Sequence, residues 1–126
     1  MEHRQMIVAG FGYRAIATTD SLRDALKATG HEHPALLAAP ADKAYAACIQ
    51  QLAQELGLSV FPVAETLLRA MQTPTQSAMA LEHRATGSVA EACALAAAGD
   101  TPVLLCDRVI SHDHRATCAI ARSSLA

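Results

Sequence analysis

The chain has 126 residues, which is enough for one domain over residues 1–126 and too few for two ordinary domains. Its composition is 52% hydrophobic, with alanine at 28 positions, and this supports a packed core rather than a disordered chain. The formal net charge of −2 argues against nucleic-acid binding. No uninterrupted apolar stretch reaches ~18 residues, which argues against a membrane span, so we expect a cytoplasmic protein.

The first third of the chain alternates strand-like and helical segments. Residues 6–9 are an apolar run followed by Gly-Phe-Gly at 10–12, which predicts a buried strand that ends in a glycine turn. Residues 18–21 offer N-cap side chains for a helix that ends at Gly30. Residues 35–39 are the second predicted strand, which Pro40 stops.

The middle third continues this alternation. Residues 42–56 carry apolar side chains at the spacing of one helical face, and Gly57 follows as the predicted C-terminal stop. Residues 58–61 are the third predicted strand. Two short helices are predicted over residues 64–71 and 77–83.

The last third contains a helix and a predicted hairpin. Ser88 and Glu91 have the spacing of a capping box, in which each side chain accepts from the other residue's amide, and the helix runs to Ala98. Residues 102–106 and 117–121 are strand-like runs on either side of a polar tip. The whole pattern predicts an α/β fold with a mixed, mainly parallel sheet and a C-terminal β-hairpin.

The segment after the first strand is the leading candidate for a ligand site. Ligands of open α/β sheets bind beyond the carboxyl ends of the strands, where Gly10, Gly12 and Arg14 are expected. The glycines would let backbone amides approach an anion, and the Arg14 guanidinium suits a carboxylate or phosphate. A tight turn with a solvated arginine explains the same residues equally well.

Two further positions could also either contact an anionic ligand or have an ordinary structural role. Gly87 and Ser88 precede a helix whose N-terminal amides could contact an anion or could simply be capped. Lys43, expected in the first turn of its helix after the second strand, could be a ligand cation or a surface charge.

The four cysteines do not indicate disulfides, a metal centre or a nucleophile. Cys106, His112, His114 and Cys118 have donors suited to zinc or cobalt, but their spacing matches no compact metal site, so we expect no metal. Neither a G-x-S-x-G elbow nor a cationic setting for a thiol is evident. We therefore assign no catalytic residue and no cofactor, and whether the chain is an enzyme stays open.

Three segments in order resemble one protein family. Residues 10–14 (GFGYR), 87–92 (GSVAEA) and 117–122 (TCAIAR) are similar to the cobalamin-biosynthesis family of CobE and the C-terminal domain of CbiG, and Lys43 also fits it. The likeness extends from residue 6 to residue 122. The resemblance implies a three-layer α/β/α fold with about five strands. It also implies a role in corrin-ring construction, on the aerobic-type route.

The resemblance and the residue chemistry suggest one binding arrangement. A corrin intermediate is an apolar macrocycle edged with carboxylates, so its binder needs an apolar shelf bordered by cations and amides. The candidate ligand-binding residues are Gly10, Phe11, Gly12, Tyr13, Arg14, Lys43, Gly87, Ser88, Glu91, Arg108 and Arg122. In this hypothesis Phe11 and Tyr13 form the shelf.

Two departures from the family pattern bear on the chemistry. Tyr13 stands where members often have cysteine, which argues against a cysteine nucleophile, and Arg108 takes the place of a frequent lysine.

The leading interpretation is a precorrin or corrinoid carrier, or an accessory factor for another step. Alternatives are a lactone hydrolase that releases acetaldehyde, as implied by the larger relatives, and an interaction module for enzymes of the pathway.

Overall fold

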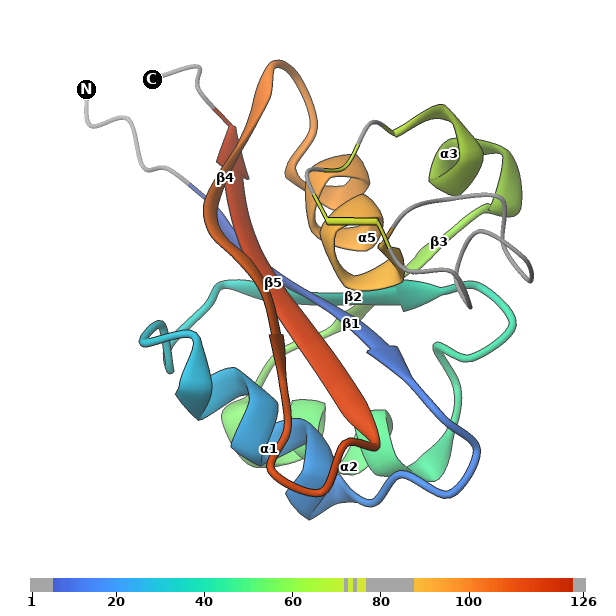
Figure 1. Ribbon diagram of the computed structural model, residues 1–126, viewed down its shortest axis with the longest axis vertical. Coiled ribbons are helices and arrows are strands. Elements are labelled where there is room, and N and C mark those ends of the chain that lie inside the picture. The colour runs from blue at the N-terminus through green and yellow to red at the C-terminus, as the bar shows by residue number, and fades with distance from the viewer. Residues whose placement is uncertain (1–5, 72, 74, 77–87, 124–126) are drawn as a thin grey trace.

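The computed structural model describes residues 6–71, 73, 75, 76 and 88–123. These residues form one sheet and the helices that cover it (Figure 1). In chain order the elements are β1 (Ile7–Tyr13), α1 (Thr19–Ala28), β2 (Leu36–Pro40), α2 (Ala47–Leu56), β3 (Val60–Val63), α3 (Glu65–Ala70), α5 (Val89–Ala98), β4 (Pro102–Ile110) and β5 (Ala116–Ser123).

The five-stranded sheet is mixed, with the strand order β3-β2-β1-β5-β4. β1, β2 and β3 pair in parallel, whereas β5 is antiparallel to both of its neighbours, β1 and β4. Four of the five strands therefore point in one direction, with β5 reversed. This arrangement confirms the predicted mixed, mainly parallel sheet, and β4 and β5 form the predicted C-terminal hairpin.

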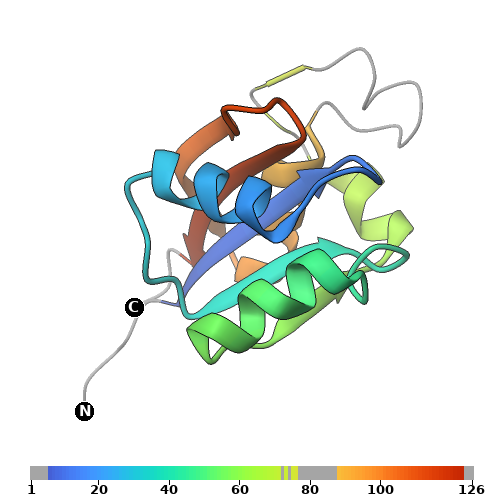
Figure 2. The same ribbon diagram turned by 90° about the horizontal axis from the view of Figure 1, so that it is seen from below.

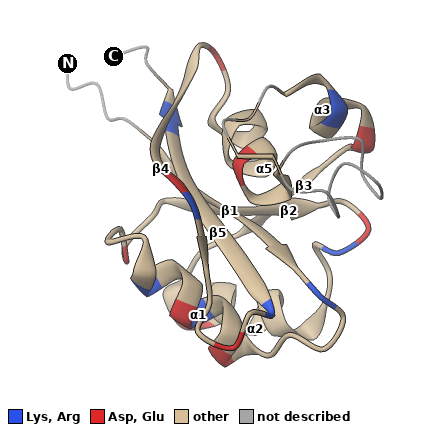
Figure 3. Cartoon of the chain, in the orientation of Figure 1, with Lys and Arg blue, Asp and Glu red and all other residues tan. Residues whose placement is uncertain are grey.

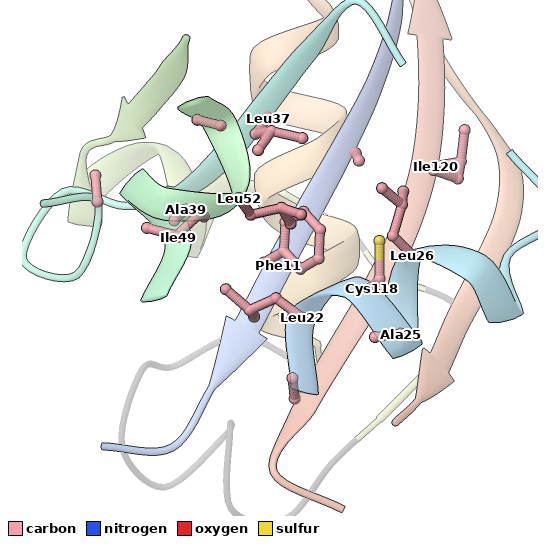
Figure 4. Close-up of a cluster of buried hydrophobic side chains, with 14 residues drawn as sticks. Phe11, Leu22, Ala25, Leu26, Leu37, Ala39, Ile49, Leu52, Cys118 and Ile120 are labelled. Carbon is pink, nitrogen blue, oxygen red and sulfur yellow. The ribbon is translucent and has the colours of Figure 1, made fainter. Parts of the chain in front are cut away.

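Helices cover both faces of the sheet, which gives the three layers implied by the resemblance (Figure 2). α1 and α2 lie side by side on one face, where Leu22, Ile49 and Leu52 pack against Phe11 and Leu37 (Figure 4). α5 packs on the other face, in contact with α3. Successive side chains of a strand point to opposite faces, so β1 contributes to both cores.

The helix predicted after residue 18 is confirmed as α1. The Thr18 side chain accepts from the Ser21 amide at 3.2 Å, and the Ser21 side chain accepts from the Thr18 amide at 3.1 Å. Leu22 and Leu26 are buried on the inner face, as the apolar spacing predicts.

The predicted glycine turn after residue 9 is wrong, because Gly10 and Gly12 lie inside β1. Neither glycine has a positive φ. A Cβ atom at Gly10 would instead overlap the backbone of Ala90 and Ala94 in α5. Glycine is thus required by the close approach of helix to strand rather than by a turn.

α2 begins at Ala47, whereas the apolar spacing predicted a start at residue 42. The preceding residues form turns in which the Lys43 amide donates to the Pro40 carbonyl at 2.9 Å. Tyr45, which was predicted on the buried helical face, is 76% exposed. The cause is a tertiary contact, because Lys43 bonds to Tyr13 through both its side chain and its carbonyl.

Other boundaries also differ from the prediction. β4 runs on to Ile110, four residues beyond the predicted strand, and β2 includes Pro40, which was predicted to stop it. β3 begins two residues later than predicted because the Leu58 amide is still bonded to the Ala53 carbonyl of α2, at 2.9 Å.

The helix predicted over 64–71 is confirmed as α3, and the one predicted over 88–98 is confirmed as α5. The helix predicted over 77–83 lies outside the described residues. Among those described, no helix has the length and apolarity needed to cross a membrane.

Candidate functional site

A pocket of about 430 Å³ opens at the end of the sheet where the parallel strands terminate. It is formed by the end of β1, the end of β4, the hairpin loop, the start of β5 and the start of α5. Its lining residues are Gly12, Tyr13, Arg14, Val89, Arg108, Ile110, His114, Arg115, Ala116 and Thr117. This location agrees with the rule that ligands of open α/β sheets bind beyond the carboxyl ends of the strands.

Arg14, Arg108 and Arg115 line this pocket together. The Arg14 amide donates to the Arg115 carbonyl at 3.0 Å, so the segment after β1 and the hairpin loop are joined directly. Figure 3 shows basic residues at the end of β1 and at the start of β5. Within the described part of the chain, none of the three guanidinium groups forms an ion pair with a carboxylate. The pocket therefore offers positive charge to an anionic ligand.

The apolar part of the pocket comes from residues of α5, β1, β4 and β5. Val89, at the start of α5, lies against Gly12, where an added Cβ would come within 3.1 Å of the Val89 Cβ. Ile110 at the end of β4 and Ala116 at the start of β5 complete the apolar lining. The site thus combines apolar walls with guanidinium groups, which is suited to a ligand with an apolar body and acidic side chains.

The hairpin loop is held in place by a compact set of hydrogen bonds. Ser111 Oγ accepts from the Ala116 amide at 3.1 Å and donates to Asp113 Oδ1 at 2.6 Å. Ser21 Oγ of α1 donates to Asp113 Oδ2 at 2.6 Å, which fastens the loop to the helix. Hydrogen bonds from Ser111 and Ser21, helped by the nearby charge of Arg115, lower the pKa of Asp113 to about 2.

Lys43 contacts Tyr13, which lines the pocket. Its ammonium donates to the Tyr13 carbonyl and lies 5.2 Å from the centre of the Tyr13 ring, while the Tyr13 hydroxyl donates to the Lys43 carbonyl. Lys43 is not among the lining residues. Its role in the structure is therefore to fix the aromatic ring, and it lies in a turn rather than in a helix as predicted.

The structure brings some of the predicted ligand-binding residues together and separates others. Gly12, Tyr13, Arg14 and Arg108 share the pocket. Phe11 is fully buried between the sheet and the helices α1 and α2, so it cannot form the exposed shelf suggested by the sequence.

Two other predicted positions lie away from the pocket. Arg122 pairs with Ile7 at the start of β1, which is the opposite end of the sheet. Gly10 faces the backbone of α5. Gly87 lies outside the described residues.

Only half of the predicted capping box is present at α5. Ser88 Oγ accepts from the Glu91 amide at 3.3 Å. The Glu91 carboxylate does not return to the Ser88 amide as predicted, because it accepts from Thr75 and from the Arg108 amide instead. Both residues are buried, and neither is among the lining residues.

Sequence reasoning missed His114 and Arg115 as pocket residues. Both lie in the polar tip of the hairpin, which the sequence identified only as a loop between two strands. The sequence does not show which strand pairs with β1. In the structure β5 is antiparallel to β1 and therefore begins near the end where β1 stops, which places the tip beside Arg14.

Three of the four cysteines lie in settings that favour the protonated thiol. Burial raises the pKa of Cys118 well above its ordinary value, and it also raises the pKa of Cys106 and of Cys48. Among the described residues, no three His, Cys, Asp or Glu side chains gather where they could hold a metal ion.

Comparison with known proteins identifies the family. Residues 7–121 match the family described as cobalamin synthesis G C-terminus. The crystal structure of CobE, described as a protein from the cobalamin (vitamin B12) biosynthetic pathway, has a TM-score of 0.85 and 30% identity, over 97% of this chain and 93% of that one. No curated protein sequence matches the chain.

Two further structures are similar. The cobalamin biosynthesis protein chiG from Agrobacterium tumefaciens has a TM-score of 0.71 and 34% identity, over 94% of this chain and 98% of that one. A protein described as a cobalamin biosynthesis protein G homologue, from Sulfolobus solfataricus, shares the fold at 21% identity with a TM-score of 0.68, and the present chain covers 38% of it. The chain belongs to the cobalamin synthesis G C-terminus family and is a cobalamin biosynthesis protein of the CobE and CbiG type.

Proposed function

We propose that this chain binds a precorrin or corrinoid intermediate of cobalamin biosynthesis and acts as a carrier or accessory factor. The observation that carries this proposal is the gathering of Arg14, Arg108 and Arg115 around an apolar-walled pocket at the carboxyl end of the sheet. Family membership supports a role in cobalamin biosynthesis. The arginines and apolar walls of the pocket are the groups that would bind such a ligand.

The pocket matches both parts of a corrinoid, its apolar ring and the acidic side chains at the ring edge. The ring body is apolar, so contact with Val89, Ile110 and the Tyr13 ring removes apolar surface from water. The acidic side chains project from the ring edge, where guanidinium groups can hold carboxylates by paired, charge-assisted hydrogen bonds. A pocket of about 430 Å³ would receive part of the macrocycle and leave the rest accessible to a receiving enzyme.

The similar structures support treating residues 1–126 as one unit for this function. The chain covers 93% of CobE and 98% of the chiG protein, so it corresponds to proteins of nearly its own length. We therefore assign the binding role to this domain.

A lactone hydrolase is the second candidate, and one observation favours it. His114 lines the pocket beside Arg115, so an imidazole is available to take a proton from water while guanidinium groups polarise a carbonyl. The raised pKa values of the Cys106 and Cys118 thiols argue against covalent catalysis by these cysteines. A hydrolase changes the mass of its ligand, whereas a carrier leaves it unchanged.

The test is a titration of the purified protein with metal-free and cobalt-containing corrin acids, followed by absorption spectra and by mass spectrometry of the recovered ligand. A spectral shift with an unchanged ligand mass supports the carrier. A mass change, with or without acetaldehyde, establishes the hydrolase. Absence of binding to every acid would contradict both and leave the interaction module, which light scattering with enzymes of the pathway would then examine.

Substitution of each pocket arginine by glutamine tests the site itself. Arg14→Gln, Arg108→Gln and Arg115→Gln should each weaken binding of a corrin acid by roughly tenfold, which corresponds to one lost charge-assisted hydrogen-bonded contact. Arg122→Gln is the matched control, since it removes the same charge at the opposite end of the sheet. Equal affinities for the control and the three pocket variants would place the ligand elsewhere.

A further inference from the structure

Glu91 is a fully buried carboxylate that joins three segments of the chain. Its Oε1 accepts from the Thr75 amide at 3.0 Å, and its Oε2 accepts from the Thr75 hydroxyl at 2.8 Å and from the Arg108 amide at 2.8 Å. Glu91 belongs to the first turn of α5, whereas Arg108 belongs to β4 on the far edge of the sheet. A carboxylate enclosed in this way holds protein groups and does not contact a ligand.

The Arg108 amide needs this acceptor because β4 bulges at that point. Cys106 pairs with Ile120 of β5 and Val109 pairs with Cys118, so β4 has two residues between these pairs where β5 has one. A β-bulge of this kind interrupts the ladder of hydrogen bonds between the strands. Glu91 supplies the acceptor for one of the bulged amides.

The bulge decides which face of the sheet Arg108 occupies. Cys106 and Val109 both pack against the core beneath α1 and α2, although they are three positions apart. In a regular strand residues two apart share a face, so Arg108 would lie on the same face as Cys106. The bulge reverses this, and Arg108 instead shares the pocket with Ile110.

We infer that Glu91 is the positioning residue that aims Arg108 into the pocket, by holding the Arg108 amide in the bulge of β4. Its effect on ligand affinity rests on the proposed function, while its effect on the backbone of β4 does not. Thr75 bonds to the same carboxylate, so Thr75 and the Arg108 amide share one partner. Removing the carboxylate should release both.

The test combines amide exchange with ligand binding. In Glu91→Ala the Arg108 amide should exchange with solvent at least roughly tenfold faster than in the unaltered protein, as measured by NMR, because its acceptor is gone. Affinity for cobyrinic acid, a corrin with carboxylate side chains, should fall about as far as in Arg108→Gln. The double variant should bind no more weakly than either single one, because both changes disable the same contact.

Two comparisons keep the test decisive. Glu91→Asp keeps the charge but shortens the side chain, so it should loosen the Arg108 amide even if Glu91→Ala fails to fold. Glu65→Gln, which removes a carboxylate from the first turn of α3, is the matched control and should leave the Arg108 amide unchanged.

Unchanged exchange of the Arg108 amide in both Glu91 variants would overturn the inference. So would full affinity in those variants when Arg108→Gln has lost it. If the unaltered protein does not bind cobyrinic acid or any other corrin acid, the proposed function fails, and the exchange of the Arg108 amide still decides the role of Glu91.

Discussion

Gly10 sets the distance between β1 and α5, because it has no Cβ atom to hold them apart. A Cβ there would overlap the Ala90 carbonyl oxygen and the Ala94 amide nitrogen, which are backbone atoms that cannot rotate away. Gly10→Ala should therefore lower the free energy of unfolding by about 3 kcal/mol or prevent folding, at the upper end of the cost of overpacking a core. Chemical denaturation followed by circular dichroism measures this.

The control for this substitution is Gly30→Ala. Nothing lies within 4 Å of a Cβ at Gly30, so only its positive φ opposes a side chain. That cost should be about 1 kcal/mol. A loss at Gly10 no larger than the loss at Gly30 would show that α5 can move away from the sheet at little cost.

At the same scale, the sequence placed some of the candidate residues correctly in the fold and misplaced others, for identifiable reasons. Arg14 lies just beyond the end of β1, as predicted, although the predicted strand ended four residues too early. Phe11 and Arg122 could not be placed from the sequence, since burial and the end of the sheet depend on which strands pair. Glu91 looked like half of a capping box, and its partners Thr75 and Arg108 are brought to it only by the tertiary fold.

At the scale of elements, the β4–β5 hairpin is attached to α1 by charged hydrogen bonds at its tip. Asp113 accepts from Ser21 of α1, and Asp24 of α1 accepts from the His112 amide at 2.6 Å. These bonds keep the loop that carries His114 and Arg115 against the helix. The tip is therefore an acid-sensitive point of the structure.

The lowered pKa of Asp113 predicts that the folded state loses stability as the pH falls. The pKa is about 2 in the folded chain and 3.8 ordinarily, so ionised Asp113 stabilises the folded state above about pH 4. This stabilisation should be lost as the pH falls from about 4 to about 2. Asp113→Asn should therefore show a shallower fall in melting temperature over that range, measured by thermal denaturation.

The control carboxylate for the acid experiment is Asp107, which is exposed on β4. Asp107→Asn should leave the steepness of the acid transition as it is in the unaltered chain. If Asp113→Asn also leaves it unchanged, the hydrogen bonds from Ser21 and Ser111 do not contribute to acid stability.

Element boundaries show where local sequence patterns stop being sufficient. α1 and α5 begin where Thr18 and Ser88 predict, because an N-cap side chain acts within its own turn. The start of α2 was wrong because the turn around Lys43 is held by Tyr13, thirty positions earlier in the chain. A periodic pattern carries no information about such a contact.

At the scale of the whole molecule, the charges are unevenly placed. The chain has a formal net charge of −2, yet three arginines face one pocket. Electrostatic attraction to an acidic ligand is therefore local to the carboxyl end of the sheet, and mobile ions should weaken it. Binding of a corrin acid should consequently depend on both the salt concentration and the ligand's own charge.

The affinity for cobyrinic acid should fall by roughly tenfold between about 0.01 and 0.15 M ionic strength, as the screening length shortens from about 30 to about 8 Å. Cobinamide, in which amides replace carboxylates, should bind at least roughly tenfold more weakly at low salt, because guanidinium groups bond more strongly to charged acceptors. Calorimetric titration of both ligands at several salt concentrations measures this. Equal affinity for acid and amide, independent of salt, would mean that apolar contact with the ring dominates and that the arginines serve another purpose.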